Sequence, residues 1–112
     1  MPESAREKEN ARARAAYEAI VADLTPAPAT ASKMFGMPCL KSPEGKAFAG
    51  LYQDAMVFKL RGPEHARALA LPGAHLFDPS GMRPMKEWVV VPTDSASVWP
   101  ALAEAALRSV ED

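Results

Sequence analysis

Residues 46–61 read KAFAGLYQDAMVFKLR, and they specify a pair of neighbouring strands. In the second half, Met56, Phe58 and Leu60 alternate with residues of mixed polarity, which is the period of a strand with one buried face. Between the two halves, Gln53-Asp54 has the length of a tight hairpin connection. The stretch therefore predicts two antiparallel strands, at 46–52 and 55–61.

A third strand is expected just before this hairpin. Residues 33–40 (KMFGMPCL) are apolar enough for a strand, but Gly36 and Pro38 interrupt them. Because proline cannot donate to the strand ladder and glycine often marks a bulge, we predict a single edge or bulged strand over 33–40. A type I turn at 42–45 (SPEG), with proline second and glycine fourth, joins it to the next strand.

After the three predicted strands, the sequence indicates a short helix and then two more strands. Gly62-Pro63 opens a short helix, because proline is well tolerated at the first helical position, and Pro72-Gly73 ends it. A short strand at 74–77, a turn at 78–81 and a β-branched strand at 85–91 follow.

Amphipathic helices are predicted at both ends of the chain. Ser4 and Glu7 have the spacing of a capping box, and apolar residues then recur every three or four positions, which predicts a helix over 5–24. The same periodicity predicts a helix over 97–110, with Ser97 as its N-cap and Pro100 in its first turn.

These elements give a two-layer α+β domain. Its predicted order is α-β-β-β-α-β-β-α, with a five-stranded antiparallel sheet and the helices on one side of it. The 112 residues have room for a single domain over 1–112, and residues 1–4 are expected to lack fixed structure.

Composition limits the classes of function. The chain has 13 Lys and Arg against 14 Asp and Glu, a net charge of −1, which excludes a global positive field that would recruit nucleic acid or membrane. Cys39 is the single cysteine, so an internal disulfide is excluded. The sequence shows no secretory signal pattern and no apolar run of about 18 residues. We therefore expect a cytoplasmic location.

Few residues suggest chemistry. His75, with Asp78 three positions later, could be an oriented base, and Cys39 could be a nucleophile, but turn and core roles account for the same residues. His65 falls in the first turn of the short helix, where a surface histidine is ordinary. The glycines form no phosphate-binding motif. We therefore predict no catalytic, cofactor-binding or metal-binding residue.

Charge is divided unevenly along the chain. Residues 33–92 hold eight basic and five acidic side chains, a balance of +3. This region could form a basic surface that contacts phosphates, although a solvated sheet face explains it as well. We predict at most weak, non-specific binding of nucleic acid. The candidate residues are Lys33, Lys59, Arg61, Arg83 and Lys86.

The strand at 85–91 predicts a second kind of surface. Alternation places Met85, Val89 and Val91 on one face and Trp88 and Val90 on the other, so both faces are largely apolar. A monomer seldom leaves a large apolar patch exposed, so we predict a homodimer through one face of this strand. Burial under a loop is the alternative.

The sequence also resembles a known family. The stretches KMFGMPCLKSPEGKAFAGLYQDAMVFKLRG (33–62) and FDPSGMRPMKEWVVVP (77–92) are similar to the TfoX (Sxy) N-terminal domain family. The residues that carry the likeness are Met34-Phe35-Gly36, Gly45-Lys46 with Phe48, Val57-Phe58-Lys59-Leu60, Gly81-x-Arg83-Pro84-Met85 and Pro92.

The resemblance covers about residues 15–110 and implies a fold like that of secretion chaperones, with kinship to bacterial regulators of natural competence. Two departures are the Met37-Pro38-Cys39 sequence, where many members are glycine-rich, and an end at Asp112 without the regulators' C-terminal helical domain. The family has no established catalytic residues, so the resemblance transfers none.

The residues and the resemblance together predict a non-enzymatic regulatory or interaction module that binds a protein or a nucleic acid. The alternative is a small-molecule-binding protein or minor enzyme that uses His75, Asp78 and Cys39.

Overall fold

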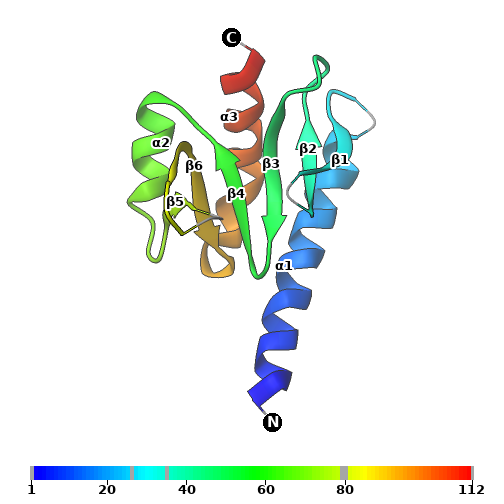
Figure 1. Ribbon diagram of the computed structural model, residues 1–112. Helices are drawn as coiled ribbons and strands as arrows, with labels where there is room; N and C mark the ends of the chain where they lie inside the picture. Colours follow the sequence, from blue (N-terminus) through cyan, green and yellow to red (C-terminus); the bar gives the residue numbers. More distant parts are fainter. Residues whose placement is uncertain (1, 26, 35, 79–80, 112) are drawn as a thin grey trace.

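The computed structural model describes residues 2–25, 27–34, 36–78 and 81–111, with side chains from Asn10 onward (Figure 1). The elements in chain order are α1 (Pro2–Leu24), β1 (Thr30–Met34), β2 (Met37–Lys41), β3 (Ala47–Tyr52), β4 (Ala55–Lys59), α2 (Gly62–Leu69), β5 (His75–Phe77), β6 (Met85–Pro92), a 3-10 helix η1 (Thr93–Val98) and α3 (Trp99–Glu111).

The chain is an α+β domain with one antiparallel sheet. Its six strands are ordered β1-β2-β3-β4-β6-β5, and every neighbouring pair is antiparallel. The prediction of five strands in the order α-β-β-β-α-β-β-α is wrong by one strand, because a fourth strand precedes α2.

The additional strand comes from residues 30–41, which form a hairpin rather than one bulged strand. Gly36 has φ +75°, a backbone conformation that glycine adopts readily, and the chain reverses there. Met34 then pairs with Met37, and Thr30 pairs with Lys41 at the other end of the ladder. Gly36 is therefore a turn residue, and β1 begins at Thr30, three residues before the predicted start of the strand.

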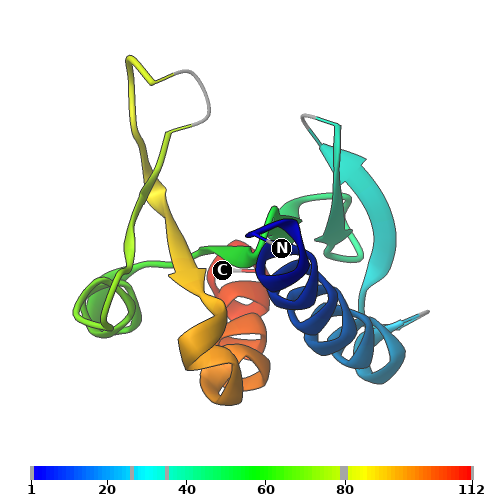
Figure 2. The same cartoon turned by 90° about the horizontal axis from the view of Figure 1, so that it is seen from below.

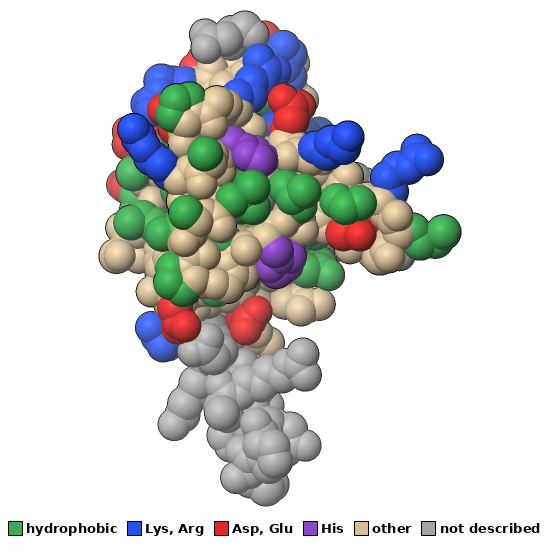
Figure 3. Space-filling view, turned by 90° about the vertical axis from the view of Figure 1, so that its left-hand side faces the viewer, with side chains coloured by type: hydrophobic (Ala, Val, Ile, Leu, Met, Phe, Trp, Pro, Cys, Tyr) green, Lys and Arg blue, Asp and Glu red, His purple; other side chains and the backbone are tan. Residues whose placement is uncertain are grey.

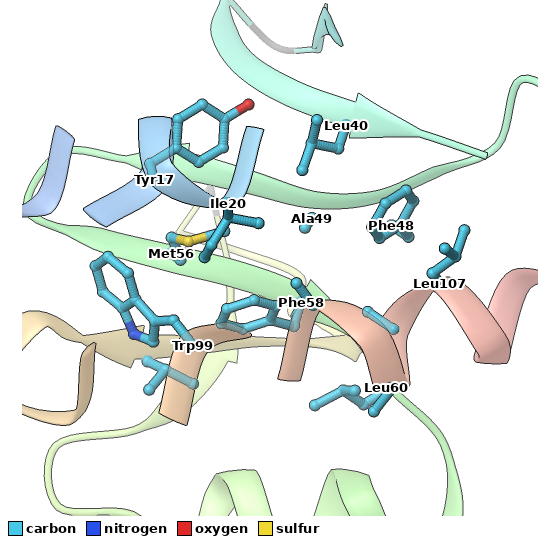
Figure 4. Close-up of a cluster of buried hydrophobic side chains, with 14 of the residues drawn as sticks. Tyr17, Ile20, Leu40, Phe48, Ala49, Met56, Phe58, Leu60, Trp99 and Leu107 are labelled. Carbon is cyan, nitrogen blue, oxygen red and sulfur yellow. The ribbon is translucent and has the colours of Figure 1, made fainter. Parts of the chain in front are cut away.

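The helices cover one face of the sheet, as predicted. Ala13, Tyr17 and Ile20 of α1 are buried there together with Trp99 and Leu107 of α3. Figure 4 shows these side chains meeting those of the central strands. The buried strand residues of this cluster include Leu40, Phe48, Ala49, Met56, Phe58, Leu60, Val89 and Val91.

The other face of the sheet carries a second apolar cluster. A sheet with helices on one face only is expected to have polar side chains on its other face. It consists of Met37, Ala55, Val57, Phe77, Trp88 and Val90, all 7% exposed or less.

The curvature of the sheet explains how this second cluster is buried. In Figure 2 the β1–β2 and β5–β6 ends of the sheet both turn away from the helices, one on each side. Phe77 of β5 and Tyr52 of β3 belong to strands that are three positions apart in the sheet, yet their ring centroids lie 5.0 Å apart in an edge-to-face arrangement. The sheet thus closes over its own apolar side chains, and Val57 beneath them is fully buried.

The C-terminal helix begins later than predicted. Thr93–Val98 is a 3-10 helix, so Ser97 lies inside it and is not the N-cap of a helix at 97–110. α3 starts at Trp99 and keeps Pro100 in its first turn, where the missing amide costs little. At its other end, Lys46 Nζ donates to the Val110 carbonyl oxygen at 3.4 Å, a favourable place for a cation at a helix C-terminus.

The chain start also differs from expectation. α1 begins at Pro2, so the backbone of residues 2–4 is helical, while Met1 lies outside the described residues. Figure 1 shows the N-terminal part of α1 extending past the sheet.

The connection at Gln53-Asp54 is a two-residue turn, as predicted, and it holds Gln53 at φ 57°. Glycine is the residue preferred where the first central position of a hairpin has positive φ. We expect Gln53→Gly to raise the free energy of unfolding by about 0.5–1 kcal/mol, since relief of strain exceeds the entropy gained by the unfolded chain. Urea denaturation measures the change. Gln53→Ala keeps the strain, so a gain as large with alanine would show that this explanation is wrong.

Candidate functional site

The three residues of the enzyme hypothesis do not form a shared site. Cys39, Gly50, Val57, Val90 and His75 are consecutive partners across five neighbouring strands. Four strand spacings of about 4.8 Å place Cys39 and His75 roughly 19 Å apart along the sheet. Cys39 is also fully buried, and burial raises the pKa of its thiol, an effect that Lys41 partly opposes.

His75 and Asp78 have local structural partners. His75 is exposed, and its Nδ1 lies 3.1 Å from the Gly73 carbonyl oxygen. Asp78 Oδ1 accepts hydrogen bonds from the amides of Gly81 at 2.8 Å and Arg83 at 3.3 Å. The interpretation of Asp78 as a turn residue is therefore confirmed.

His65 joins α2 to β6. Its Nε2 lies 2.7 Å from the Lys86 carbonyl oxygen, so Nε2–H donates to the strand backbone. The two histidines are the purple groups in Figure 3, where hydrophobic side chains separate them. They make no joint site.

The five candidate basic residues do not gather on one surface. Lys33 is on β1, at one edge of the sheet, while Lys86 is on β6, four strands away. Lys59 is half-buried at the end of β4. Arg61 forms an ion pair with Glu87 at 3.2 Å, with both side chains about half exposed, so part of its charge is balanced locally. The positive balance of residues 33–92 is spread around the sheet.

The predicted dimer face is not exposed within this fold. Trp88, Val89, Val90 and Val91 are each 7% exposed or less, and Met85 is half-buried. The assignment of faces was also wrong at Met85, because the register shifts between Leu76 and Phe77 and places Met85 opposite Phe77. Met85 therefore packs with Trp88 and Val90 on the face away from the helices. The homodimer itself stays a prediction, without these four residues as its interface.

A groove between α2 and α3 is the feature that sequence reasoning missed. Three adjoining cavities of about 200, 230 and 200 Å³ share lining residues along it and form what we term the α2–α3 groove. Its residues are Arg61, Glu64, Arg67, Ala68 and Leu71 from α2 and its flanks, and Val98, Ala101, Leu102, Ala105, Arg108 and Ser109 from η1 and α3.

Local sequence explains why a groove remains there. Gly62, with φ +59°, and Pro63 turn the chain out of β4 directly into α2, which is only eight residues long. Its single fully buried side chain is Ala68, so α2 reaches the core through a small residue. Ala101 and Ala105 of α3 face the same space and do not fill it.

The two ends of the groove differ in character. The cavity at one end is lined by Ala68, Leu71, Val98 and Leu102 and by one charged residue, Arg67. Val98 is 38% exposed and is one of two large apolar side chains exposed in the described part of the chain.

The opposite end of the groove is charged. It is lined by Arg61, Glu64, Arg108 and Ser109. On the side of the molecule shown in Figure 3, most Lys and Arg side chains lie in the upper half, toward the end at which α3 terminates. Apolar side chains therefore predominate at one end of the groove, and the guanidinium groups of Arg61 and Arg108 lie at the other.

A sequence pattern could have indicated this site. Ala101, Ala105 and Arg108 recur at spacings of four and three on a helix whose other face is apolar. Small residues on the second face of a helix permit the close approach of another segment.

Metal ligands and membrane-spanning helices are two further features of the described part of the chain that bear on function. In that part of the chain, no group of three or more His, Cys, Asp or Glu side chains could hold a metal ion. None of its helices is both long and apolar enough to cross a membrane.

No protein-family model, curated protein or solved structure matches the chain in the three comparisons that were made. The resemblance to the TfoX N-terminal family therefore stays a prediction from the sequence.

Tyr17 gives the fold a dependence on alkaline pH. Burial raises its pKa from 10 to about 12, and the neighbouring Cys39 adds to the rise. The unfolded chain loses this proton first, so the stabilisation is complete below pH 10 and disappears as the pH rises through 12. We expect a loss of up to about 2–3 kcal/mol over that interval. Urea denaturation at pH 9, 10 and 11 measures it.

The matched variant is Tyr17→Phe, which keeps the buried ring and removes the ionisable group. Its stability should fall less steeply with pH than that of the parent chain. An equal slope for the two proteins would rule Tyr17 out as the source.

Proposed function

We propose that this protein is a non-enzymatic interaction module that binds a partner protein in the α2–α3 groove. The observation that carries the proposal is the groove itself, a continuous hollow with an apolar end and three flanking arginines. This agrees with the regulatory role that the resemblance to the TfoX N-terminal family implies. A cytoplasmic location and membership of that family are part of the same proposal.

The chemistry of the groove supports binding. Arginine stays protonated at all physiological pH values, so Arg61, Arg67 and Arg108 can hold an anion but are poor proton carriers. The Ser109 hydroxyl is already 2.7 Å from the Lys59 carbonyl oxygen and 2.8 Å from that of Ala106. It is thus tied to the backbone of β4 and α3, and the lining provides no histidine to activate it.

The shape of the groove favours a chain segment over a small molecule. Pockets for small ligands enclose most of the ligand surface. Here three shallow cavities follow one another along α3, which suits an elongated partner that leaves one side in solvent.

The alternative function lacks its site. A small-molecule-binding protein or enzyme that uses His75, Asp78 and Cys39 needs these side chains together, and Cys39 lies four strands away from His75 in the sheet. Nucleic acid is also a weaker candidate partner, because the positive residues are dispersed and aromatic side chains do not line the groove.

Blocking the groove tests the proposal. Ala101 is exposed on α3 and lines the groove, so Ala101→Arg places a long side chain in it without disturbing the core. Ala19 is exposed on α1, and Ala19→Arg is the matched control. Immobilised parent and variant proteins are compared for the proteins that each retains from an extract of the native host. Retention should be lost with Ala101→Arg and kept with Ala19→Arg, and equal retention by both variants would contradict the proposal.

A further inference from the structure

The two ends of the α2–α3 groove differ, so a segment bound along it has a preferred orientation. Eleven residue steps separate Val98 from Ser109, or roughly 16 Å along the helix. The apolar cavity lies at the Val98 end, and the cavity lined by Arg61, Arg108 and Ser109 lies at the other. An occupant that fills the whole groove must therefore have one apolar end and one polar end.

The charges along the groove favour an anionic occupant. Three arginines line the groove against one carboxylate, that of Glu64. Arg61 is paired with Glu87 outside the groove. Neither Arg67 nor Arg108 forms a salt bridge with any side chain in the described part of the chain. These two guanidinium groups stand on facing helices, α2 and α3, and both line the middle cavity.

Carboxylates match this arrangement better than phosphates of a nucleic acid. Arginine binds carboxylates and phosphates alike through two parallel hydrogen bonds, so the rest of the groove lining decides between them. A nucleic acid backbone would bring successive phosphates past Glu64 and onto the apolar end, where Val98 and Leu102 offer them nothing. A peptide can instead present aliphatic side chains at that end.

Resting on the proposed function, we propose that the partner contributes an acidic segment, with aliphatic side chains at the Val98 end and carboxylates at the middle cavity, which Arg67 and Arg108 both line. The segment spans about 16 Å, which corresponds to roughly three turns of helix. Charge complementarity sets which segments bind, and the apolar end sets their direction.

Synthetic peptides test the charge preference. The probe is a capped 12-residue helical peptide with leucines in its first half and glutamates in its second. A second peptide has lysine in place of every glutamate. Calorimetric titration into the full chain should show the glutamate peptide binding at least tenfold more tightly. Equal affinities for the two peptides, or no binding of the glutamate peptide at millimolar concentration, would overturn the inference.

Charge reversal locates the site. The double variant Arg67→Glu with Arg108→Glu should bind the glutamate peptide at least tenfold more weakly than the parent chain does. It should bind the lysine peptide more tightly. Both residues are exposed, so the fold should be kept, and circular dichroism verifies it. Lys33→Glu with Arg14→Glu, the same change of charge at two exposed positions outside the groove, should alter affinity less than twofold. An equal effect of this control pair would show that only the net charge matters, which would overturn the inference.

The two proposals fail differently. If Ala101→Arg abolishes retention of the natural partner but the peptides show no charge preference, the groove binds a partner of another chemistry. If Ala101→Arg leaves retention unchanged, the proposed function itself is wrong.

Discussion

Replacing Trp99 with alanine is expected to lower the free energy of unfolding by about 3–5 kcal/mol, because the side chain is fully buried where α3 begins. Trp99 packs in the same cluster as Tyr17, Ile20 and Met56, so its loss opens a cavity between the helices and the sheet. For a domain whose total stability is of the order of 5–15 kcal/mol, this is a large fraction. Denaturation in urea, followed by circular dichroism, measures the change.

Trp99→Phe distinguishes the contribution of the ring volume to stability from that of the polar Nε1–H group. The indole Nε1 of Trp99 is buried and has no hydrogen-bond partner in the described structure. Phenylalanine removes this unsatisfied donor, whose desolvation costs about 1–3 kcal/mol, and keeps most of the ring volume. We therefore expect Trp99→Phe to cost less than about 1.5 kcal/mol. A loss close to that of the alanine variant would mean that the Nε1–H group is satisfied.

Replacing Phe77 with alanine should cost a similar 3–5 kcal/mol, although Phe77 lies on an edge strand of three residues. The reason is the curved sheet: Phe77 is 1% exposed and contacts Tyr52 from across the sheet. If this face were open to solvent, the same substitution would cost less than about 1 kcal/mol. Urea denaturation distinguishes the two values.

Leu76→Ala is the matched control for Phe77. Leu76 is the preceding residue of β5, half-buried and outside both apolar clusters, so its truncation should cost clearly less. Tyr52→Leu, alone and combined with Phe77→Ala, should give a coupling energy of about 0.5–1.5 kcal/mol for the ring contact. A coupling near zero would contradict the closed form of the sheet.

The parts of the fold that sequence predicted well are those set by local periodicity. The buried face of α1, with Ala13, Tyr17 and Ile20, and the strands on either side of Gln53-Asp54 agree with the structure. The hairpin at 30–41 was missed because Gly36 can mark either a bulge or a reversal. Only pairing with another strand distinguishes the two, and here Met34 pairs with Met37.

The second apolar cluster was beyond sequence reasoning for a different reason. Alternation shows which residues share a face, but it does not show whether a sheet curls far enough to bury that face. The contact between Tyr52 and Phe77 depends on the summed curvature of four strands. The apolar strand around Trp88 was consequently interpreted as a dimer interface, whereas its own chain covers it.

The α2–α3 groove was missed because it is built from segments about 40 residues apart in the sequence. Arg67 and Arg108 have no relation along the chain, and only the packing of α2 beside α3 brings them to one cavity. Charge counting found Arg61, which follows β4, but placed it in a surface with Lys33, which lies three strands away on the edge strand β1.

Amide chemical-shift mapping by NMR tests the assignment of the groove most directly. The ¹⁵N-labelled chain is titrated with the glutamate peptide, and the lysine peptide serves as the control. We predict that the shifts concentrate in residues 61–71 and 98–109 and that the signals of β1 and β2 stay unchanged. Shifts centred on the β1–β2 and β5–β6 hairpins would place binding on the opposite face of the sheet and contradict the proposed function.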